Sequence, residues 1–269
     1  MPHSVRSLRS AALAAGLSLV APSVFAQAFD IVRLLGGETK TDIGFVGAAV
    51  VFGDAYMGSD ENRTRVLPSL DYQWQNGWFA GTTNGIGYNF SDSPREMSYG
   101  LRVTADFGRK ENRSEALRGM GDVDARAEFG GFFNYYLTRE IAVFTTLRYG
   151  SGDGSDGVVV DLGLAYTTLL APGWRLGLTL GTTWVDSNYM QSFFGVTPEQ
   201  SLTSAYAPYS AGSGIRDVRT GVSLTYDITS NIGVTTAVAA RSLQGDAKDS
   251  PLTRDRSSIG GVVALAYRF

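Results

Sequence analysis

The chain has 269 residues, of which 43% are hydrophobic and 18% charged, with 33 glycines, no cysteine and one histidine, His3. The absence of cysteine excludes disulfide scaffolds, thiolate zinc sites and cysteine nucleophiles. Because His3 lies in a segment that we expect to be removed, histidine-based catalysis and HExxH zinc sites are excluded too. A formal charge of −3 argues against a nucleic-acid-binding face. We therefore expect no enzymatic activity, no cofactor, no metal and no nucleic-acid partner.

Residues 1–26 are predicted to be a secretory signal peptide. Two arginines precede an uncharged apolar run over residues 11–21, which is too short to cross a bilayer as a helix. A proline follows the run, and small residues stand before Gln27, so we expect cleavage at that point. The mature domain is then 27–269.

The mature chain alternates apolar and polar residues with a period of two, which indicates β-strands. In the stretch 174–184, the even positions hold Trp at both ends and Leu, Leu, Leu and Thr between them, whereas the odd positions hold Arg, Gly or Thr. Ten steps of ~3.4 Å, tilted by about 40°, project to roughly 26 Å, close to the ~25 Å apolar band of outer-membrane barrels. Its two tryptophans would lie in the aromatic girdles. Similar alternation recurs in 97–107, 125–137, 140–150, 157–169, 217–228 and 231–242.

A soluble β-sandwich also alternates, but two features favour a transmembrane barrel. The strands are about 10 to 13 residues long, whereas sandwich strands cluster near about five or six. The last strand alternates through Tyr267 and ends on Phe269. This terminal pattern resembles the signal that the outer-membrane assembly machinery recognises. We therefore expect an all-β, antiparallel transmembrane barrel in the outer membrane of a Gram-negative bacterium, with lipid and that machinery as partners.

The lengths of the connections predict orientation, because short turns face the periplasm and long loops face outward. Three long connections, 108–124, 186–214 and 244–257, are therefore expected outside. Eleven strands follow: 43–53, 64–74, 77–90, 97–107, 125–137, 140–150, 157–169, 173–184, 216–227, 231–242 and 258–269. A single-chain bacterial barrel is expected to have an even number. We expect twelve, with 28–35 as the additional strand, and ten as the alternative if an N-terminal assignment is wrong.

Charged residues of both signs are predicted to face the lumen. A selective channel would show one dominant sign, so we favour arginine–carboxylate pairs that fill a narrow lumen and stabilise the barrel. The candidates are Arg102, Asp106, Arg126, Glu128, Arg148, Asp161, Arg175, Asp217, Arg219, Asp227, Arg241 and Arg268.

The loop 186–214 is rich in aromatic residues among small ones. Exposed aromatics at this density could anchor a partner, or the loop could fold inward and plug the barrel, which we favour slightly. The candidate contact residues are Tyr189, Phe193, Phe194, Tyr206 and Tyr209.

Several long motifs resemble the MipA/OmpV family of Gram-negative outer-membrane proteins. The strings are YMGSDENRTRVLPSLDY (56–72), ALRGMGDVDA (116–125), NYMQSFFGVTPEQS (188–201) and GDAKDSPLTRDRSS (245–258), followed by the C-terminal AYRF. They span essentially the whole mature chain in the expected order. Met57, where an acidic residue is expected, and Lys248, within a run of small residues, depart from the pattern.

The resemblance implies a barrel whose family namesake scaffolds a murein lytic transglycosylase and a penicillin-binding protein. Other members have been regarded as porins, osmotic-response proteins or adhesins. We therefore expect a non-enzymatic scaffold for murein-remodelling enzymes, with a small-solute porin or a surface adhesin as alternatives. A scaffold needs periplasmic contact surface, and the expected periplasmic turns are short. The contact would have to come from residues 27–42 or from the barrel rim.

Overall fold

The computed structural model describes residues 42–91, 96–151 and 156–269. The predicted signal peptide and the candidate strand 28–35 lie outside the described residues. No helix within the described ranges is long and apolar enough to cross a membrane.

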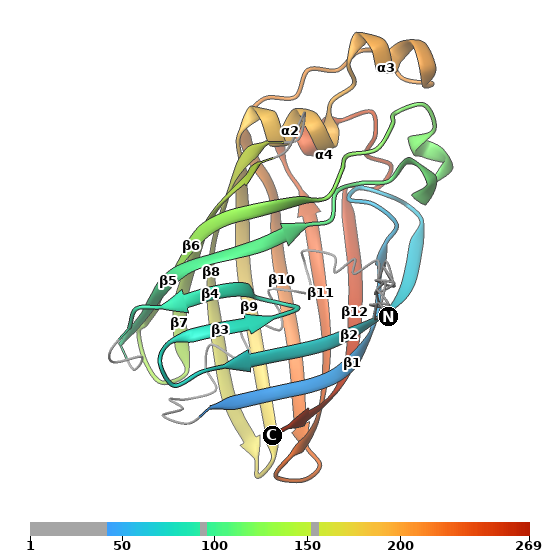
Figure 1. Ribbon diagram of the computed structural model, residues 1–269. Helices are drawn as coiled ribbons and strands as arrows, with labels where there is room; N and C mark the ends of the chain where they lie inside the picture. The colour runs from blue at the N-terminus through green and yellow to red at the C-terminus, as the bar shows by residue number, and fades with distance from the viewer. Residues whose placement is uncertain (1–41, 92–95, 152–155) are drawn as a thin grey trace, which may run out of the picture.

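The described residues form a closed barrel of twelve antiparallel strands, each paired with its neighbours in chain order, and β1 pairs with β12 (Figure 1). The strands are β1 Ile43–Asp54, β2 Asn62–Gln73, β3 Trp78–Gly81, β4 Gly85–Asn89, β5 Met97–Asp106, β6 Arg126–Tyr136, β7 Ile141–Ser151, β8 Gly157–Ala171, β9 Trp174–Val185, β10 Gly214–Asp227, β11 Ile232–Leu243 and β12 Ser257–Arg268. Closure matters in lipid, where no water is available to satisfy a free backbone edge. The expected all-β fold class and the count of twelve are confirmed.

The twelfth strand, however, comes from a different place than the one we expected. The predicted single strand 77–90 is a hairpin of two short strands, β3 and β4, joined by the turn 82–84. The dipeptide Asn84-Gly85 ends this turn, and Gly85 has a φ of +73°, which favours glycine. Apolar and polar residues alternate on both sides of the turn, so the pattern gives no sign that the strand is interrupted there. An even number of strands therefore needs no contribution from 28–35.

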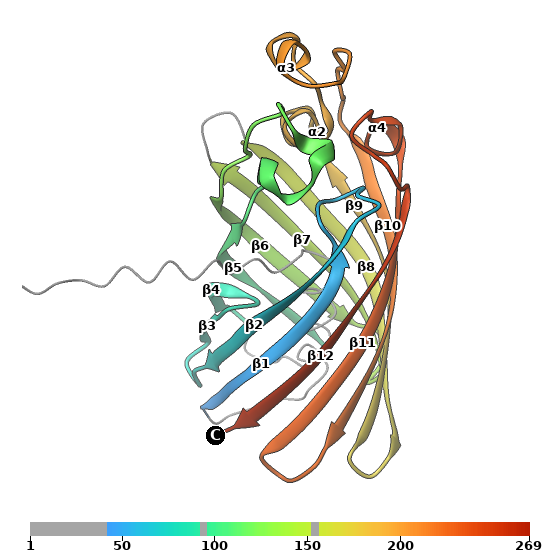
Figure 2. The same ribbon diagram turned by 90° about the vertical axis from the view of Figure 1, so that its right-hand side faces the viewer.

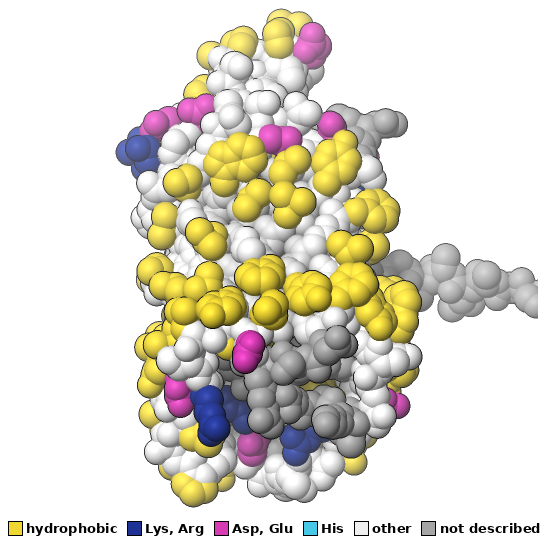
Figure 3. Space-filling model, turned by 90° about the vertical axis from the view of Figure 1, so that its left-hand side faces the viewer, with side chains coloured by type: hydrophobic (Ala, Val, Ile, Leu, Met, Phe, Trp, Pro, Cys, Tyr) yellow, Lys and Arg dark blue, Asp and Glu magenta, His cyan; other side chains and the backbone are white. Residues whose placement is uncertain are grey.

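The outer surface of the barrel is apolar along its middle. Figure 3 shows hydrophobic side chains spread across one outer face, with the charged side chains of that face toward its two ends. Aromatic pairs mark the periplasmic end: the rings of Trp174 and Tyr226 stack at 4.4 Å, and those of Trp78 and Tyr88 meet edge to face at 5.4 Å. Trp184, at the opposite end of β9, is also exposed. The strand 174–184 thus carries an indole at each membrane interface, as expected.

The long connections all lie at one end of the barrel and contain the helices, as Figure 2 shows. The opposite end has short turns, and the hairpins β8–β9 and β10–β11 extend farthest there. By the rule of loop lengths, the helical end is extracellular. The helices are the 3-10 turns η1 Glu111–Arg113 and η2 Glu115–Leu117, and the α-helices α2 Ser187–Phe194, α3 Pro198–Thr203 and α4 Gly245–Asp249.

The seam between β1 and β12 closes with the C-terminal residue. The backbone amide and carbonyl of Phe269 exchange hydrogen bonds of 3.0 Å with Gly44. Tyr267 pairs with Val46 in the ladder, and its ring is exposed on the outer face. Both side chains are exposed in the folded barrel, and their recognition by the assembly machinery stays a prediction. The inner side of this wall is packed with small side chains: Ala49, Val51, Ala237, Ala239, Val262 and Ala264.

Close packing at this seam makes a glycine substitution informative. A Cβ added at Gly47 would lie 2.1 Å from the backbone carbonyl oxygen of Leu265, whereas one at Gly261 would meet nothing closer than 3.6 Å. Backbone atoms in a closed ladder cannot move aside cheaply, so we expect Gly47→Ala to lower the free energy of unfolding by about 1–3 kcal/mol.

Urea unfolding of the refolded protein, followed by the loss of the compact, heat-modifiable gel band, measures this difference. Gly261→Ala serves as the matched control and should change the midpoint little. Equal midpoints for the two variants would contradict the packing of the seam.

Candidate functional site at the capped end of the lumen

A chain of buried ion pairs lines the lumen near its extracellular end, beginning on β6. Arg148 of β7 donates to Glu128 of β6 and to Asp161 of β8, each at 2.8 Å. Asp161 also accepts hydrogen bonds from the hydroxyls of Thr146, at 2.9 Å, and Thr183, at 2.6 Å. Both carboxylates are almost fully buried. Their charges are therefore stabilised by these partners rather than by water.

The series of ion pairs continues on β10. Arg219 contacts Asp161 at 3.0 Å and Asp217 at 2.8 Å, and Asp217 in turn accepts from Arg216 Nε at 2.6 Å. Arg216 then donates through Nη1 to the hydroxyl of Tyr189 at 2.8 Å. We refer to the sequence of contacts Glu128, Arg148, Asp161, Arg219, Asp217 and Arg216 as the ion-pair chain. It links four strands of the barrel wall to helix α2.

Arg216 is a residue that the sequence analysis missed. The ladder between β9 and β10 shifts register between Ile215 and Asp217, so Arg216 is the extra residue of a β-bulge. A bulge allows two consecutive side chains, Arg216 and Asp217, to be buried together in the lumen. Strict alternation assigns adjacent residues to opposite faces. The pattern alone therefore gave no signal for this arginine.

Two further pairs extend the charged layer. Arg126 lies 3.7 Å from Asp106 and stands over the ring of Tyr189 at 5.2 Å, and Gly150 leaves the space for its guanidinium. On the other side of the lumen, Arg241 lies 3.8 Å from Asp54. With these pairs, five arginines face five carboxylates. Equal numbers of both signs produce no single-sign field, which favours the structural interpretation over a selective channel.

The remaining lumen candidates lie elsewhere. Arg102 donates to the amide oxygen of Asn84 at 3.3 Å and stands over the ring of Phe132 at 5.9 Å, lower in the lumen. Arg175 follows Trp174 at the periplasmic end of β9. The structure thus brings together Asp106, Arg126, Glu128, Arg148, Asp161, Asp217, Arg219 and Arg241 but not Arg102, Arg175, Asp227 or Arg268.

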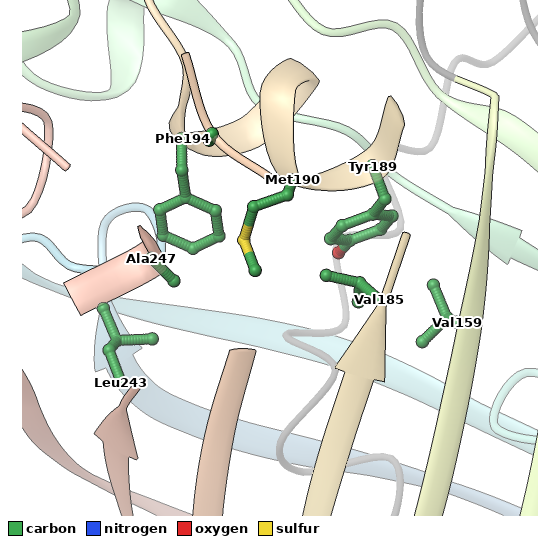
Figure 4. Close-up of a cluster of buried hydrophobic side chains, with 8 residues drawn as sticks. Val159, Val185, Tyr189, Met190, Phe194, Leu243 and Ala247 are labelled. Carbon is green, nitrogen blue, oxygen red and sulfur yellow. The ribbon is translucent and has the colours of Figure 1, made fainter. Parts of the chain in front are cut away.

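Helix α2 lies directly above the ion-pair chain. The side chains of Tyr189, Met190 and Phe194 point down from the helix and are buried (Figure 4). They pack on the tops of the strands and on α4, through Val159, Val185, Leu243 and Ala247. A carboxylate at the N-cap, Asp186, accepts from the amide of Tyr189 at 3.0 Å and fixes the start of the helix. The α2 part of the loop 186–214 therefore packs onto the barrel, whereas α3 rises above it, and the plug stays a prediction (Figure 1).

The other aromatic residues of this loop also lie against protein. Phe193 stacks on Tyr189 with ring centroids 4.5 Å apart. Tyr206 and Tyr209 are partly buried against a small cluster of apolar side chains from three loops. The hydroxyl of Tyr206 donates to the carbonyl of Ala116 at 2.8 Å, and that of Tyr209 donates to Asp246 at 3.0 Å. These positions leave the five aromatics poorly placed to anchor an external partner.

Four extracellular connections, 55–61, 107–125, 186–213 and 244–256, join into one structure, which we call the cap. Tyr56 donates to the carbonyl of Leu252 at 2.9 Å, and Ser250 donates to Phe194 at 2.6 Å. Gln200 donates to the carbonyl of Met120 at 2.7 Å. Because side chains of one loop bind the backbone of another, no loop can move without breaking contacts to its neighbours.

Burial shifts the pKa of ionisable groups inside the cap. It raises the pKa of Tyr189 to about 12, so the phenol is neutral at pH 7 and accepts from Arg216 as a hydroxyl. It lowers the pKa of Arg109 to about 10, so this guanidinium remains charged while it donates to Phe193 at 2.8 Å. In the part of the chain that the structure describes, no group of three His, Cys, Asp or Glu residues could hold a metal ion.

Comparison with known proteins agrees with this architecture. A family model described as "MltA-interacting protein MipA" matches residues 46–269. The chain belongs to the MipA family. The match confirms the resemblance of the loop motifs, which form most of the cap.

The names of two relatives of this MipA-family protein state a cellular location. Two proteins from Escherichia coli strains, both named "Putative outer membrane protein YiaT", are 26% identical over 234 residues, covering 83% of this chain and 90% of theirs. Among solved structures, the NanC porin covers 82% of this chain and 98% of its own, at 13% identity and a TM-score of 0.48. The KdgM porin covers 84% and 99%, at 11% identity and a TM-score of 0.45. The named relatives and the closed barrel place the protein in the outer membrane, as expected.

The ion-pair chain predicts a large effect of one isosteric substitution. Asp161→Asn keeps the shape of the side chain but removes the charge that two arginines share. Because Arg148 and Arg219 would remain buried with one partner fewer, we expect the free energy of unfolding to fall by about 3–5 kcal/mol.

Urea unfolding in detergent measures this loss. Asp227→Asn, at an exposed position at the periplasmic end of β10, is the matched control and should behave like the wild type. A loss at Asp161 no greater than at Asp227 would show that the buried pairs do not stabilise the barrel.

Proposed function

We propose that this MipA-family protein is a non-enzymatic outer-membrane barrel that serves as a scaffold for murein-remodelling enzymes. The packing at the extracellular end supports this proposal most strongly. Helix α2 lies over the ends of β8 and β9, and the ion-pair chain beneath it lines the lumen with balanced charge. A lumen lined in this way carries no dominant charge to select a solute, which favours a role in presenting a surface.

The name of the family points to the class of partner. Its description names an interaction with MltA, a murein lytic transglycosylase, and the resemblance adds a penicillin-binding protein. Murein enzymes act on the periplasmic side of the outer membrane. The contact surface of a scaffold must therefore lie at the end of the barrel with the short turns.

The hairpins β8–β9 and β10–β11 supply such a surface. They extend below the ends of β1 and β12 in both ribbon views (Figures 1 and 2). Leu169 and Leu170, beside a register shift in β8, are 70% and 58% exposed, and Ile228 in the next turn is 50% exposed. Exposed apolar side chains near one another at a rim are typical of protein contact sites. We assign the scaffold contact to these two hairpins.

Pull-down from a detergent extract of the envelope, with the purified full-length barrel as bait, tests the assignment. We expect the wild type to retain a murein transglycosylase or penicillin-binding protein. The variant Leu169→Glu/Ile228→Glu should lose most of it, because charges replace the apolar contact. Leu137→Glu, at a leucine that is 55% exposed in the turn after β6, is the control and should retain the enzyme.

Two results would contradict the proposal. One is retention of no murein enzyme by the wild-type barrel. The other is stable, reproducible conductance of the wild-type protein in planar bilayers, which would favour the small-solute porin instead.

A further inference from the structure

Arg63 and Arg65 face the lumen from the extracellular half of β2. In the ladder with β1 they stand opposite Gly53 and Val51, and directly paired residues of an antiparallel ladder share a face. Val51 belongs to the apolar cluster on the inner side of the wall, against which Leu67 also packs. The two arginines therefore lie on the inner face of the barrel, away from lipid.

This half of β2 has a strand partner on one side alone. Strand β3 pairs with β2 only along Asp71–Gln73. Elsewhere in the lumen, an arginine meets a carboxylate on the next strand, as Arg148 of β7 meets Asp161 of β8 at 2.8 Å. Within the described residues, no strand pairs with 62–69 on this side, so no neighbouring strand supplies a carboxylate to Arg63 or Arg65.

A third arginine, Arg113, approaches from the loop 107–125. It lies in η1, and its Nη1 donates to the carbonyl of Gly108 at 3.1 Å. The hydroxyl of Ser114 donates to Glu61 at 3.0 Å and so ties η1 to the residues that lead into β2. These contacts hold Arg113 within electrostatic reach of the two arginines of β2. We refer to the three as the arginine cluster.

Like charges meet in the arginine cluster. Burial lowers the pKa of Arg113, and the nearby Arg63 lowers it further, against the opposite effect of two carboxylates. In the described part of the chain, Arg65 donates only to backbone carbonyls, those of Asp54 at 3.5 Å and Ala55 at 3.3 Å. None of the three guanidiniums forms an ion pair with a described carboxylate. Their mutual repulsion is unfavourable unless an anion joins them.

The carboxylates near the cluster already have partners of their own. Asp106 lies 3.7 Å from Arg126, and Asp122 lies 3.0 Å from Lys110. Glu61 accepts the hydrogen bond that ties η1 to β2. Supplying one of these carboxylates to the cluster would disturb those contacts. An anion from outside the chain is therefore the better partner.

We propose that the arginine cluster binds the phosphate group of a water-soluble solute in the lumen. A phosphate monoester offers three terminal oxygens and about two negative charges, which suit guanidiniums converging from β2 and from η1. A carboxylate offers fewer oxygens and a single charge. Arg63 is exposed and Arg65 half-buried, so a solute reaches them from the inner face. The cluster lies at the opposite end of the barrel from the hairpins β8–β9 and β10–β11, and its role is independent of the scaffold contact.

Isothermal titration calorimetry of the full-length protein folded in detergent tests the proposal, with pyrophosphate as the probe in buffer free of divalent cations. We expect Arg63→Gln/Arg65→Gln/Arg113→Gln to bind about tenfold more weakly than the wild type, because charge-assisted contacts are lost. Arg113→Gln alone leaves every strand unchanged and should weaken binding about threefold. Pyrophosphate should also raise the urea midpoint of the wild type but not that of the triple variant.

Two controls separate the site from charge in general. Arg118→Gln/Arg254→Gln/Arg256→Gln removes the same charge from exposed positions of the cap and should bind as the wild type does. Citrate, which carries a similar charge at pH 7 on carboxylates, should bind the wild type about tenfold more weakly than pyrophosphate. Heat-modifiable migration verifies that each variant is folded.

Three results would each overturn the proposal. The first is the absence of pyrophosphate binding by the wild type. The second is equal affinity of the two triple variants for pyrophosphate. The third is equal affinity of the wild type for citrate and pyrophosphate, which would indicate attraction by charge without recognition of phosphate.

Discussion

Burial of charge at the extracellular end of the lumen is the constraint on which both the barrel and its cap depend. An isolated carboxylate or guanidinium in a dry interior is costly, and it is tolerated only with excellent partners. Asp161 meets this condition through two arginines and two threonine hydroxyls. Each arginine in turn contacts a second carboxylate, so the strands β6 to β10 are held in one arrangement. Loss of any member would leave its neighbours buried and incompletely paired.

The same network fixes the cap. Arg216 belongs both to the ion-pair chain and to α2, through the hydroxyl of Tyr189. Polar and apolar contacts then spread outward from α2 to the other extracellular loops. The extracellular loops are consequently fixed on the barrel as one structure. The periplasmic hairpins are left exposed at the opposite end (Figures 1 and 2).

Much of this fold could be predicted from the sequence, because a membrane imposes a simple rule on each strand. Lipid requires apolar residues at every second position, so the faces of β5 to β12 and most lumen charges followed from alternation. The rule cannot detect a break that preserves alternation, which is why it predicts one strand over 77–90 where the structure has a hairpin. Nor can it place a bulged residue such as Arg216. Contacts within the cap were beyond it as well, since they join residues as distant as Ala116 and Tyr206 through side chain and backbone.

Hydrogen–deuterium exchange of the backbone amides of α2 tests most directly whether the cap is a fixed closure of the barrel. In the protein folded in detergent or nanodiscs, we expect the amides of 190–194 to exchange as slowly as those at the adjoining ends of β9 and β10. Exchange of these amides as fast as in an unstructured peptide, while the strands stay protected, would contradict it.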